Sequence, residues 1–204
     1  MIQNLKKINH ILLKKNTYLF YLQKKGQHIY GSDFKLTKHI IEALIKVRPY
    51  ITNNAGEARK EKLNIEKGVF ILGNSMVGKT SLMYLIKGLF LFPQQYQIRS
   101  CYEIESMVLK YGEIYLSNLL KKQNWCFDDF GSRFNSKHIE IMKILLYHLC
   151  NQTNARSHHV ICKLTKQEII LLYGNEFYQS ILNNFNVITI EKHEKNSKKN
   201  MYLP

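Results

Sequence analysis

One eight-residue stretch constrains the fold of this chain more than any other. Residues 73–80 read Gly-Asn-Ser-Met-Val-Gly-Lys-Thr, the complete G-x-x-x-x-G-K-[ST] pattern of a phosphate-binding loop. An apolar run, residues 68–72, precedes it, and a stretch with helical spacing of its apolar residues, 81–86, follows it. Such a loop functions between a buried strand and a helix whose N-terminal end attracts anions. The sequence therefore predicts a strand–loop–helix unit that binds a nucleoside triphosphate.

The residues of this loop have separate expected roles. Gly73 and Gly78 let the backbone curl, so that its N–H groups face phosphate oxygens. Lys79 is the expected catalytic contact to the β- and γ-phosphates, and the Thr80 hydroxyl is an expected Mg²⁺ ligand. The expected nucleotide-binding residues are Gly73, Asn74, Ser75, Met76, Val77, Gly78, Lys79, Thr80 and Ser81.

A second motif follows about fifty residues later, a spacing that suits a β-α-β-α-β arrangement. The apolar run 125–127 ends in two acids, Asp128 and Asp129. A carboxylate at the end of a strand near the phosphate loop can hold Mg²⁺ together with Thr80. The neighbouring acid can orient and deprotonate the attacking water. We therefore assign Asp128 to the metal and Asp129 to water activation.

Strand-like and helix-like patterns alternate along the chain, which predicts an α/β fold with a parallel sheet and helices on both faces. We expect Pro49 to stop the helix 35–47, residues 49–66 to form a loop, and Ser136 to cap the helix 136–151. The other expected strands are 97–101, 125–127, 159–162 and 187–190, and the other helices are 103–122 with a break near Gly112, 165–172 and 176–183.

The predicted domains are a basic, helical N-terminal extension at 1–34, a P-loop ATPase domain at 35–190 and a polar C-terminal tail at 191–204. The extension carries paired lysines between apolar residues, beginning with Lys6 and Lys7. It could be an arm for DNA or for a partner protein, or a solvated face whose apolar side docks on the core. The sequence leaves both interpretations open.

Charge and composition restrict the partners. The chain has 30 Lys and Arg against 15 Asp and Glu, a net charge of +15. Such an excess indicates an anionic partner, most often nucleic acid, and we expect DNA; a general lysine richness of the chain is the alternative source of the charge. No apolar run approaches the roughly 20 residues of a membrane span. The cysteines form no C-x-x-C pair, so we expect a cytoplasmic protein without a zinc site or a disulfide framework.

Two other nucleotide-dependent classes fit the sequence less well. Residues 128–131 also read D-x-x-G, as in small GTPases, but no guanine-reading Asn-Lys-x-Asp follows; the nearest tetrapeptide, 162–165, lacks both Asn and Asp. ATP is therefore the expected nucleotide. A small-molecule phosphotransferase usually has an arginine-bearing lid, whereas the five arginines of this chain are scattered.

Several segments together resemble the bacterial AAA+ ATPases of the DnaC helicase-loader and IstB transposase-helper group. The likeness covers roughly residues 35–200 and rests on 67–74, 127–131, 164–169, 173–175 and 185–188. The resemblance implies an AAA+/RecA-like sheet that uses ATP and Mg²⁺. It also implies an ATP-driven accessory factor that acts on a replicative helicase, or on DNA beside a transposase, and forms a homo-oligomer of adjacent subunits.

Three positions depart from the pattern of that group. Met76 stands where a further glycine is usual, which we expect to stiffen and crowd the loop. Residues 161–163 replace a Thr-Thr-Asn whose Asn senses the γ-phosphate, and Ser180 stands where an arginine finger is expected. An arginine finger contributes about 10³–10⁵ in rate, so slow hydrolysis is expected. A non-hydrolysing ATP-binding scaffold is the alternative.

Other residues could compensate for these losses. We hypothesise that Lys163, at the end of a strand, contacts the γ-phosphate, and that Arg133 or Arg156 reaches the nucleotide of a neighbouring subunit. His158 and His159 are adjacent on a predicted strand and therefore point to opposite faces. They are expected to be surface or core residues and not metal ligands.

Overall fold

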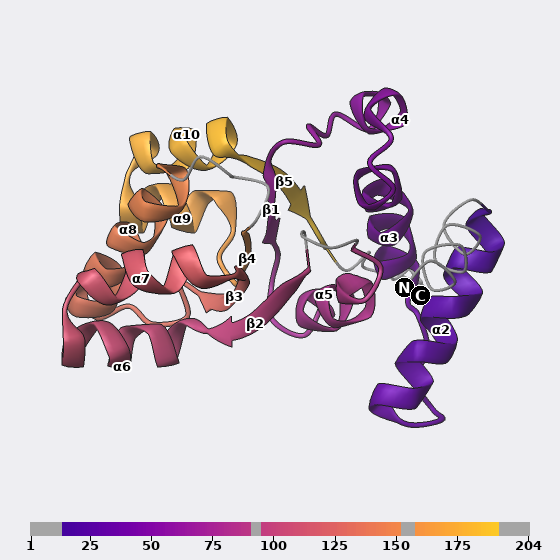
Figure 1. Ribbon diagram of the computed structural model, residues 1–204, viewed down its shortest axis with the longest axis horizontal. Helices are drawn as coiled ribbons and strands as arrows, with labels where there is room; N and C mark the ends of the chain where they lie inside the picture. The colour runs from indigo at the N-terminus through magenta and orange to yellow at the C-terminus, as the bar shows by residue number, and fades with distance from the viewer. Residues whose placement is uncertain (1–13, 91–94, 152–157, 192–204) are drawn as a thin grey trace, which may run out of the picture.

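The computed structural model describes residues 14–90, 95–151 and 158–191, and within them a five-stranded parallel sheet forms the centre of the molecule (Figure 1). The strand order is β2-β3-β4-β1-β5, so β1 lies between β4 and β5. This confirms the predicted α/β fold. The strands are β1 Gly68–Leu72, β2 Tyr96–Ser100, β3 Asn124–Phe130, β4 His159–Cys162 and β5 Phe185–Thr189.

Helices cover both faces of the sheet and create two hydrophobic cores (Figure 1). Side chains alternate across a strand, so Val69 and Ile71 of β1 enter one core while Phe70 and Leu72 enter the other. All of β1 is buried, as is usual for a central parallel strand. The first core receives α2 Lys15–Tyr30, α3 Lys38–Ile51, α4 Ala55–Lys60 and α5 Lys79–Lys87; the second receives α6 Cys101–Tyr111, α7 Ile114–Lys122, α8 Ser136–Cys150, α9 Lys166–Tyr173 and α10 Asn175–Asn184.

The helix expected at 35–47 ends later than predicted. Helix α3 continues through Pro49 and ends at Ile51. Proline costs only one hydrogen bond in a last turn, and the burial of Tyr50 and Ile51 in the core outweighs that local preference. The break expected between 103 and 122 is confirmed, because Gly112 follows the last residue of α6.

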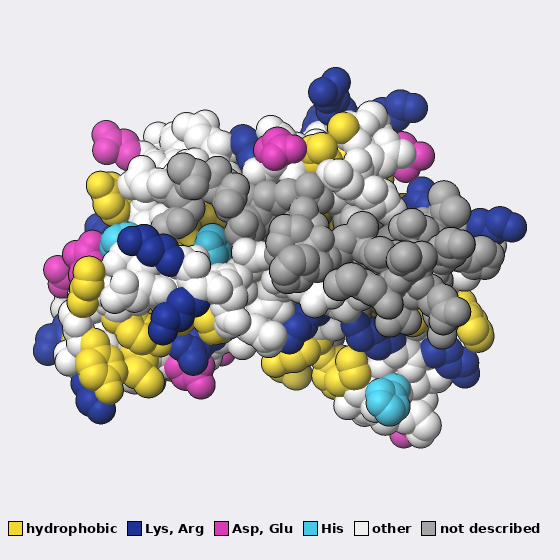
Figure 2. Space-filling model, viewed as in Figure 1, with side chains coloured by type: hydrophobic (Ala, Val, Ile, Leu, Met, Phe, Trp, Pro, Cys, Tyr) yellow, Lys and Arg dark blue, Asp and Glu magenta, His cyan; other side chains and the backbone are white. Residues whose placement is uncertain are grey.

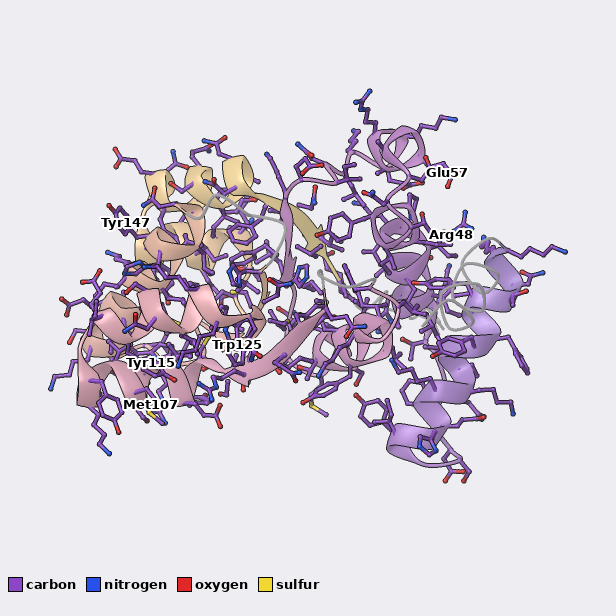
Figure 3. All side chains as sticks on the ribbon, in the orientation of Figure 1. Arg48, Glu57, Met107, Tyr115, Trp125 and Tyr147 are labelled. Carbon is purple, nitrogen blue, oxygen red and sulfur yellow. The ribbon has the colours of Figure 1, made fainter. Side chains whose placement is uncertain are left out.

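Two further corrections concern asparagine caps. Residues 55–60 form the short helix α4 inside the predicted loop, because the Asn54 side chain accepts a hydrogen bond from the Glu57 N–H. An ion pair of 3.5 Å between Arg48 and Glu57 ties α4 to α3, and both residues are labelled in Figure 3. Helix α8 is capped by Asn135, which accepts from the His138 N–H, and not by Ser136.

The described part of the N-terminal extension packs its apolar side on the first of the two hydrophobic cores. Tyr18 and Leu22 of α2 are buried, and the Tyr18 hydroxyl donates to the Leu44 carbonyl at 3.2 Å. The paired lysines Lys6 and Lys7 and the tail from 192 onward lie outside the described residues. On the face drawn in Figure 2, Lys and Arg side chains outnumber Asp and Glu. Among the described residues, no helix is both long enough and apolar enough to cross a membrane.

Candidate nucleotide-binding site

The phosphate loop connects β1 to α5 at the carboxyl edge of the sheet. Its two glycines have backbone angles φ of 143° at Gly73 and 86° at Gly78, a region that other residues rarely adopt. A Cβ on Gly73 would collide with the Ile190 carbonyl oxygen, and one on Gly78 would lie 3.0 Å from Ile40. The curled backbone therefore depends on glycine at both positions.

The first turn of α5 offers its N–H groups to a ligand. The residue before α5 is Gly78, which has no side chain to cap the helix, so the first N–H groups have no capping partner. Lys79 is buried, and its Nζ donates to the carbonyl oxygens of Gly73 and, at 2.7 Å, Asn74. Burial lowers the pKa of Lys79. This arrangement of amides and one ammonium suits a phosphate group.

Thr80 and Asp128 come together although β4 separates β1 from β3. The Thr80 hydroxyl donates to Asp128 Oδ2 at 2.9 Å. Burial raises the pKa of Asp128, while the hydrogen bonds from Thr80 and from the Asp129 N–H oppose this rise. A carboxylate and a hydroxyl at this distance fit a Mg²⁺ ion that takes its remaining ligands from phosphates and water. Their role as metal ligands stays a prediction.

Asp129 pairs with Lys163, the residue after β4, at a point where β3 is irregular. The pairing of β3 with β4 shifts register between Phe127 and Phe130, and Asp129 has φ 64°. Such a bulge re-aims a side chain, and aspartate tolerates this backbone region better than most residues. Asp129 Oδ1 lies 2.6 Å from Lys163 Nζ, and this hydrogen bond raises the pKa of Lys163. The predicted water-activating carboxylate is thus ion-paired.

The other residues of the loop differ in their exposure to solvent. Asn74 and Ser75 are exposed, Val77 is buried and Ser81 is half-buried. Met76 has φ 62°, which explains why glycine suits this position, and its side chain is 91% exposed. The methionine therefore does not crowd the loop as the sequence suggested.

Residues from other elements, missed from the sequence, complete the site. His39 Nε2, at the start of α3, lies 3.1 Å from the Val77 carbonyl oxygen and 3.0 Å from Thr37 Oγ1. It therefore holds the phosphate loop from outside. A cavity of about 660 Å³ lies between the loop, Thr189 and the start of α9. No local pattern around His39 indicates this contact. At the start of α9, Thr165 and Glu168 form a capping box.

The positions considered for an arginine finger make other contacts or lie outside the described residues. The Ser180 hydroxyl donates to the Glu176 carbonyl within α10. Arg133 is 3.3 Å from Glu105 and stacks on Tyr102, while Arg156 lies outside the described residues. The described residues contain no group of three or more His, Cys, Asp or Glu side chains that could hold a metal.

The two adjacent histidines lie in the core and point to opposite faces, as predicted. His158 Nδ1 accepts from the Trp125 N–H at 3.2 Å, and His159 Nδ1 accepts from the Val69 N–H at 3.1 Å. His158 stands beside Phe127, and His159 packs among the aromatic rings of the other core. Each histidine therefore links β4 to one neighbouring strand.

The solved structures that are similar to this chain include two that show the extent of the likeness. A crystal structure of the DnaC helicase loader matches with a TM-score of 0.58 and 17% identity, covering 78% of this chain and 94% of that one. A crystal structure of DnaI matches with a TM-score of 0.55 and 18% identity, covering 79% and 87%. No protein-family model and no curated protein matches the sequence. At this identity the likeness shows the fold, and it confirms the P-loop NTPase fold that the resemblance implied.

Proposed function

We propose that this chain binds ATP with Mg²⁺, hydrolyses it slowly, and serves as an accessory ATPase of DNA replication of the helicase-loader type. One observation carries the nucleotide part. The 2.9 Å hydrogen bond between Thr80 and Asp128 joins the phosphate loop to the acidic strand end. The two motifs therefore form one site of the composition that triphosphate hydrolysis requires.

Different residues would bind the nucleotide, hold the metal and promote hydrolysis. The loop amides and Lys79 would hold the β- and γ-phosphates, while Thr80 and Asp128 would hold the metal. Mg²⁺, when bound, supplies positive charge that neutralises the phosphate oxygens. Asp129 would accept the proton of the water that attacks the γ-phosphorus, and the bond to the β–γ bridging oxygen breaks to leave ADP.

The ion pair between Asp129 and Lys163 supports slow turnover. One carboxylate oxygen of Asp129 already accepts a hydrogen bond at 2.6 Å, so this acid must leave Lys163 before it can accept a proton. Ser180, at the position where the resemblance expects an arginine finger, bonds within its own helix. Both observations also favour the second candidate function, an ATP-binding scaffold that does not hydrolyse.

A single-turnover assay with Asp129→Asn beside the parent chain tests the enzymatic proposal. We expect Mg²⁺-dependent ATP binding in both and hydrolysis about 10²–10⁴-fold slower in the variant. Equal rates would show that Asp129 is not the base. Turnover in neither protein, with ATP bound, would establish the scaffold.

The proposed partners are DNA and a replicative helicase, with homo-oligomeric assembly in the cytoplasm. The fold shared with a structure described as a helicase loader supports this choice, and a transposase is the alternative partner. A binding assay at low salt with a purified ring helicase and a purified transposase separates the two. Binding to neither partner, and to no DNA, would contradict the accessory role even where ATP binds.

A further inference from the structure

A second cleft lies at the opposite edge of the sheet, where β2 and β3 begin. Its volume is about 300 Å³, at the lower end of the range of ligand pockets. Helix α2, the C-terminal end of α5 and the first residues of both strands surround it. None of the described residues that line it is Asp or Glu. Its polar and aromatic side chains include Lys25, Tyr84, Lys87, Gln97, Gln123 and Asn124.

Two ammonium groups share this cleft, and the part of its lining that the structure describes carries no carboxylate. Lys25 Nζ donates to the Leu85 carbonyl at 2.7 Å, and Lys87 Nζ donates to Gln97 Oε1 at 2.8 Å. Burial and the positive charge of Lys87 both lower the pKa of Lys25. The positive charges of Lys25 and Lys87 therefore repel each other in a partly buried environment. A bound anion would reduce that repulsion.

The other side chains of the cleft suit a nucleobase. Tyr84 is 41% exposed, and an exposed tyrosine ring can stack on a base. Gln97, Gln123 and Asn124 bring neutral amides, which both donate and accept hydrogen bonds, as base edges do. In Figure 2, Lys or Arg side chains lie beside hydrophobic side chains along the lower edge, near the position of α5 in Figure 1.

We propose that this cleft binds one nucleotide of single-stranded DNA, with its base on Tyr84 and its phosphate beside Lys87 and Lys25. The choice of DNA as ligand rests on the proposed role in replication. A single strand fits better than a duplex, because the faces of paired bases are stacked inside a duplex. Helix α5 carries Lys79 and Thr80 at one end and Tyr84 and Lys87 at the other, so DNA and ATP would contact the same nine-residue helix.

Fluorescence anisotropy with a labelled oligothymidylate and the full chain tests the proposal. Loss of one base–aromatic stack predicts that Tyr84→Ala weakens binding between about 5-fold and 150-fold. Lys87→Gln should reduce the slope of log affinity against log salt by about 0.7. The matched controls are Tyr147→Ala, which removes an exposed tyrosine of α8 labelled in Figure 3, and Lys60→Gln on α4. Both should bind like the parent.

Measuring ATP binding on every variant separates this inference from the proposed function. If the cleft variants bind ATP and bind DNA like their controls, DNA lies elsewhere and the inference is wrong while the ATPase proposal stands. If the parent binds ATP but no single strand, the cleft is not a DNA site. If duplex DNA is weakened by Tyr84→Ala as strongly as a single strand, stacking is not the mechanism.

Discussion

The phosphate loop and the facing ends of β3 and β4 lie on the same edge of the sheet, but they are fixed in different ways. Lys79 bonds to carbonyl oxygens five and six residues before it, so local sequence sets the loop. Asp129 of β3 meets Lys163, the residue after β4, where the pairing of the two strands shifts register. In the proposed function, phosphate binding would therefore depend on one short segment, whereas the rate of hydrolysis would depend on the register of two strands.

Replacing Lys79 gives the largest expected effect and tests the phosphate loop, the region that local sequence sets. Lys79→Ala removes the one side-chain cation inside the loop, so we expect hydrolysis to fall about 10²–10³-fold, as for other preorganised donors. ATP binding and single-turnover rate are the measurements. Lys143→Ala, at an exposed position of α8, is the control and should behave like the parent. Normal hydrolysis by Lys79→Ala would remove the loop from the mechanism.

Lowering the pH tests the contact between β3 and β4, because His158 links these strands at the end opposite to Asp129 and Lys163. Burial lowers the pKa of His158 to about 4 from an ordinary value of 6.5. The unfolded chain therefore binds this proton first, and its contribution of about 3 kcal/mol to the free energy of unfolding, complete above pH 6.5, is lost as the pH falls toward 4. Urea unfolding between pH 7 and 4 measures the loss.

The matched variant for this measurement is His158→Asn. Asparagine keeps a hydrogen-bond acceptor for the Trp125 N–H but cannot take a proton. Between pH 7 and 4 its stability should therefore fall less than that of the parent, by up to about 3 kcal/mol. Parallel pH profiles would show that other groups cause the acid sensitivity.

The sequence predicted the features that local rules specify. The strand–loop–helix unit and the acids after 125–127 each lie within a few residues, and the parallel sheet follows from the alternation of strands and helices. It did not predict the ion pair of Lys163, because a bulge turns Asp129 toward β4 and no local pattern indicates the bulge. The contact of His39 with the loop depends on the packing of α3, which is equally non-local.

Removing Lys163 tests whether the ion pair restrains hydrolysis. The pair is about one-third exposed, so it contributes at most about 1 kcal/mol. Lys163→Ala should free Asp129 and raise the single-turnover rate about 2- to 5-fold, with ATP affinity unchanged. If the variant instead binds ATP more weakly and turns over more slowly, Lys163 contacts the γ-phosphate, as hypothesised from the sequence. A variant identical to the parent in rate and affinity would exclude both roles.

The smallest expected effect concerns Met76 of the phosphate loop, where a residue other than glycine has a positive φ. Met76 has a left-handed backbone and a side chain in solvent, so Met76→Gly loses little contact and removes about 1 kcal/mol of strain. The greater freedom of glycine in the unfolded chain offsets part of this gain, which leaves a rise of about 0.5 kcal/mol in the free energy of unfolding. Met107→Gly, within helix α6, should lower it by about 1 kcal/mol. Chemical unfolding of both variants measures the two changes in the free energy of unfolding. The change is expected to be favourable at Met76 only because of its backbone conformation. Destabilisation at both positions would show that the Met76 backbone is not strained.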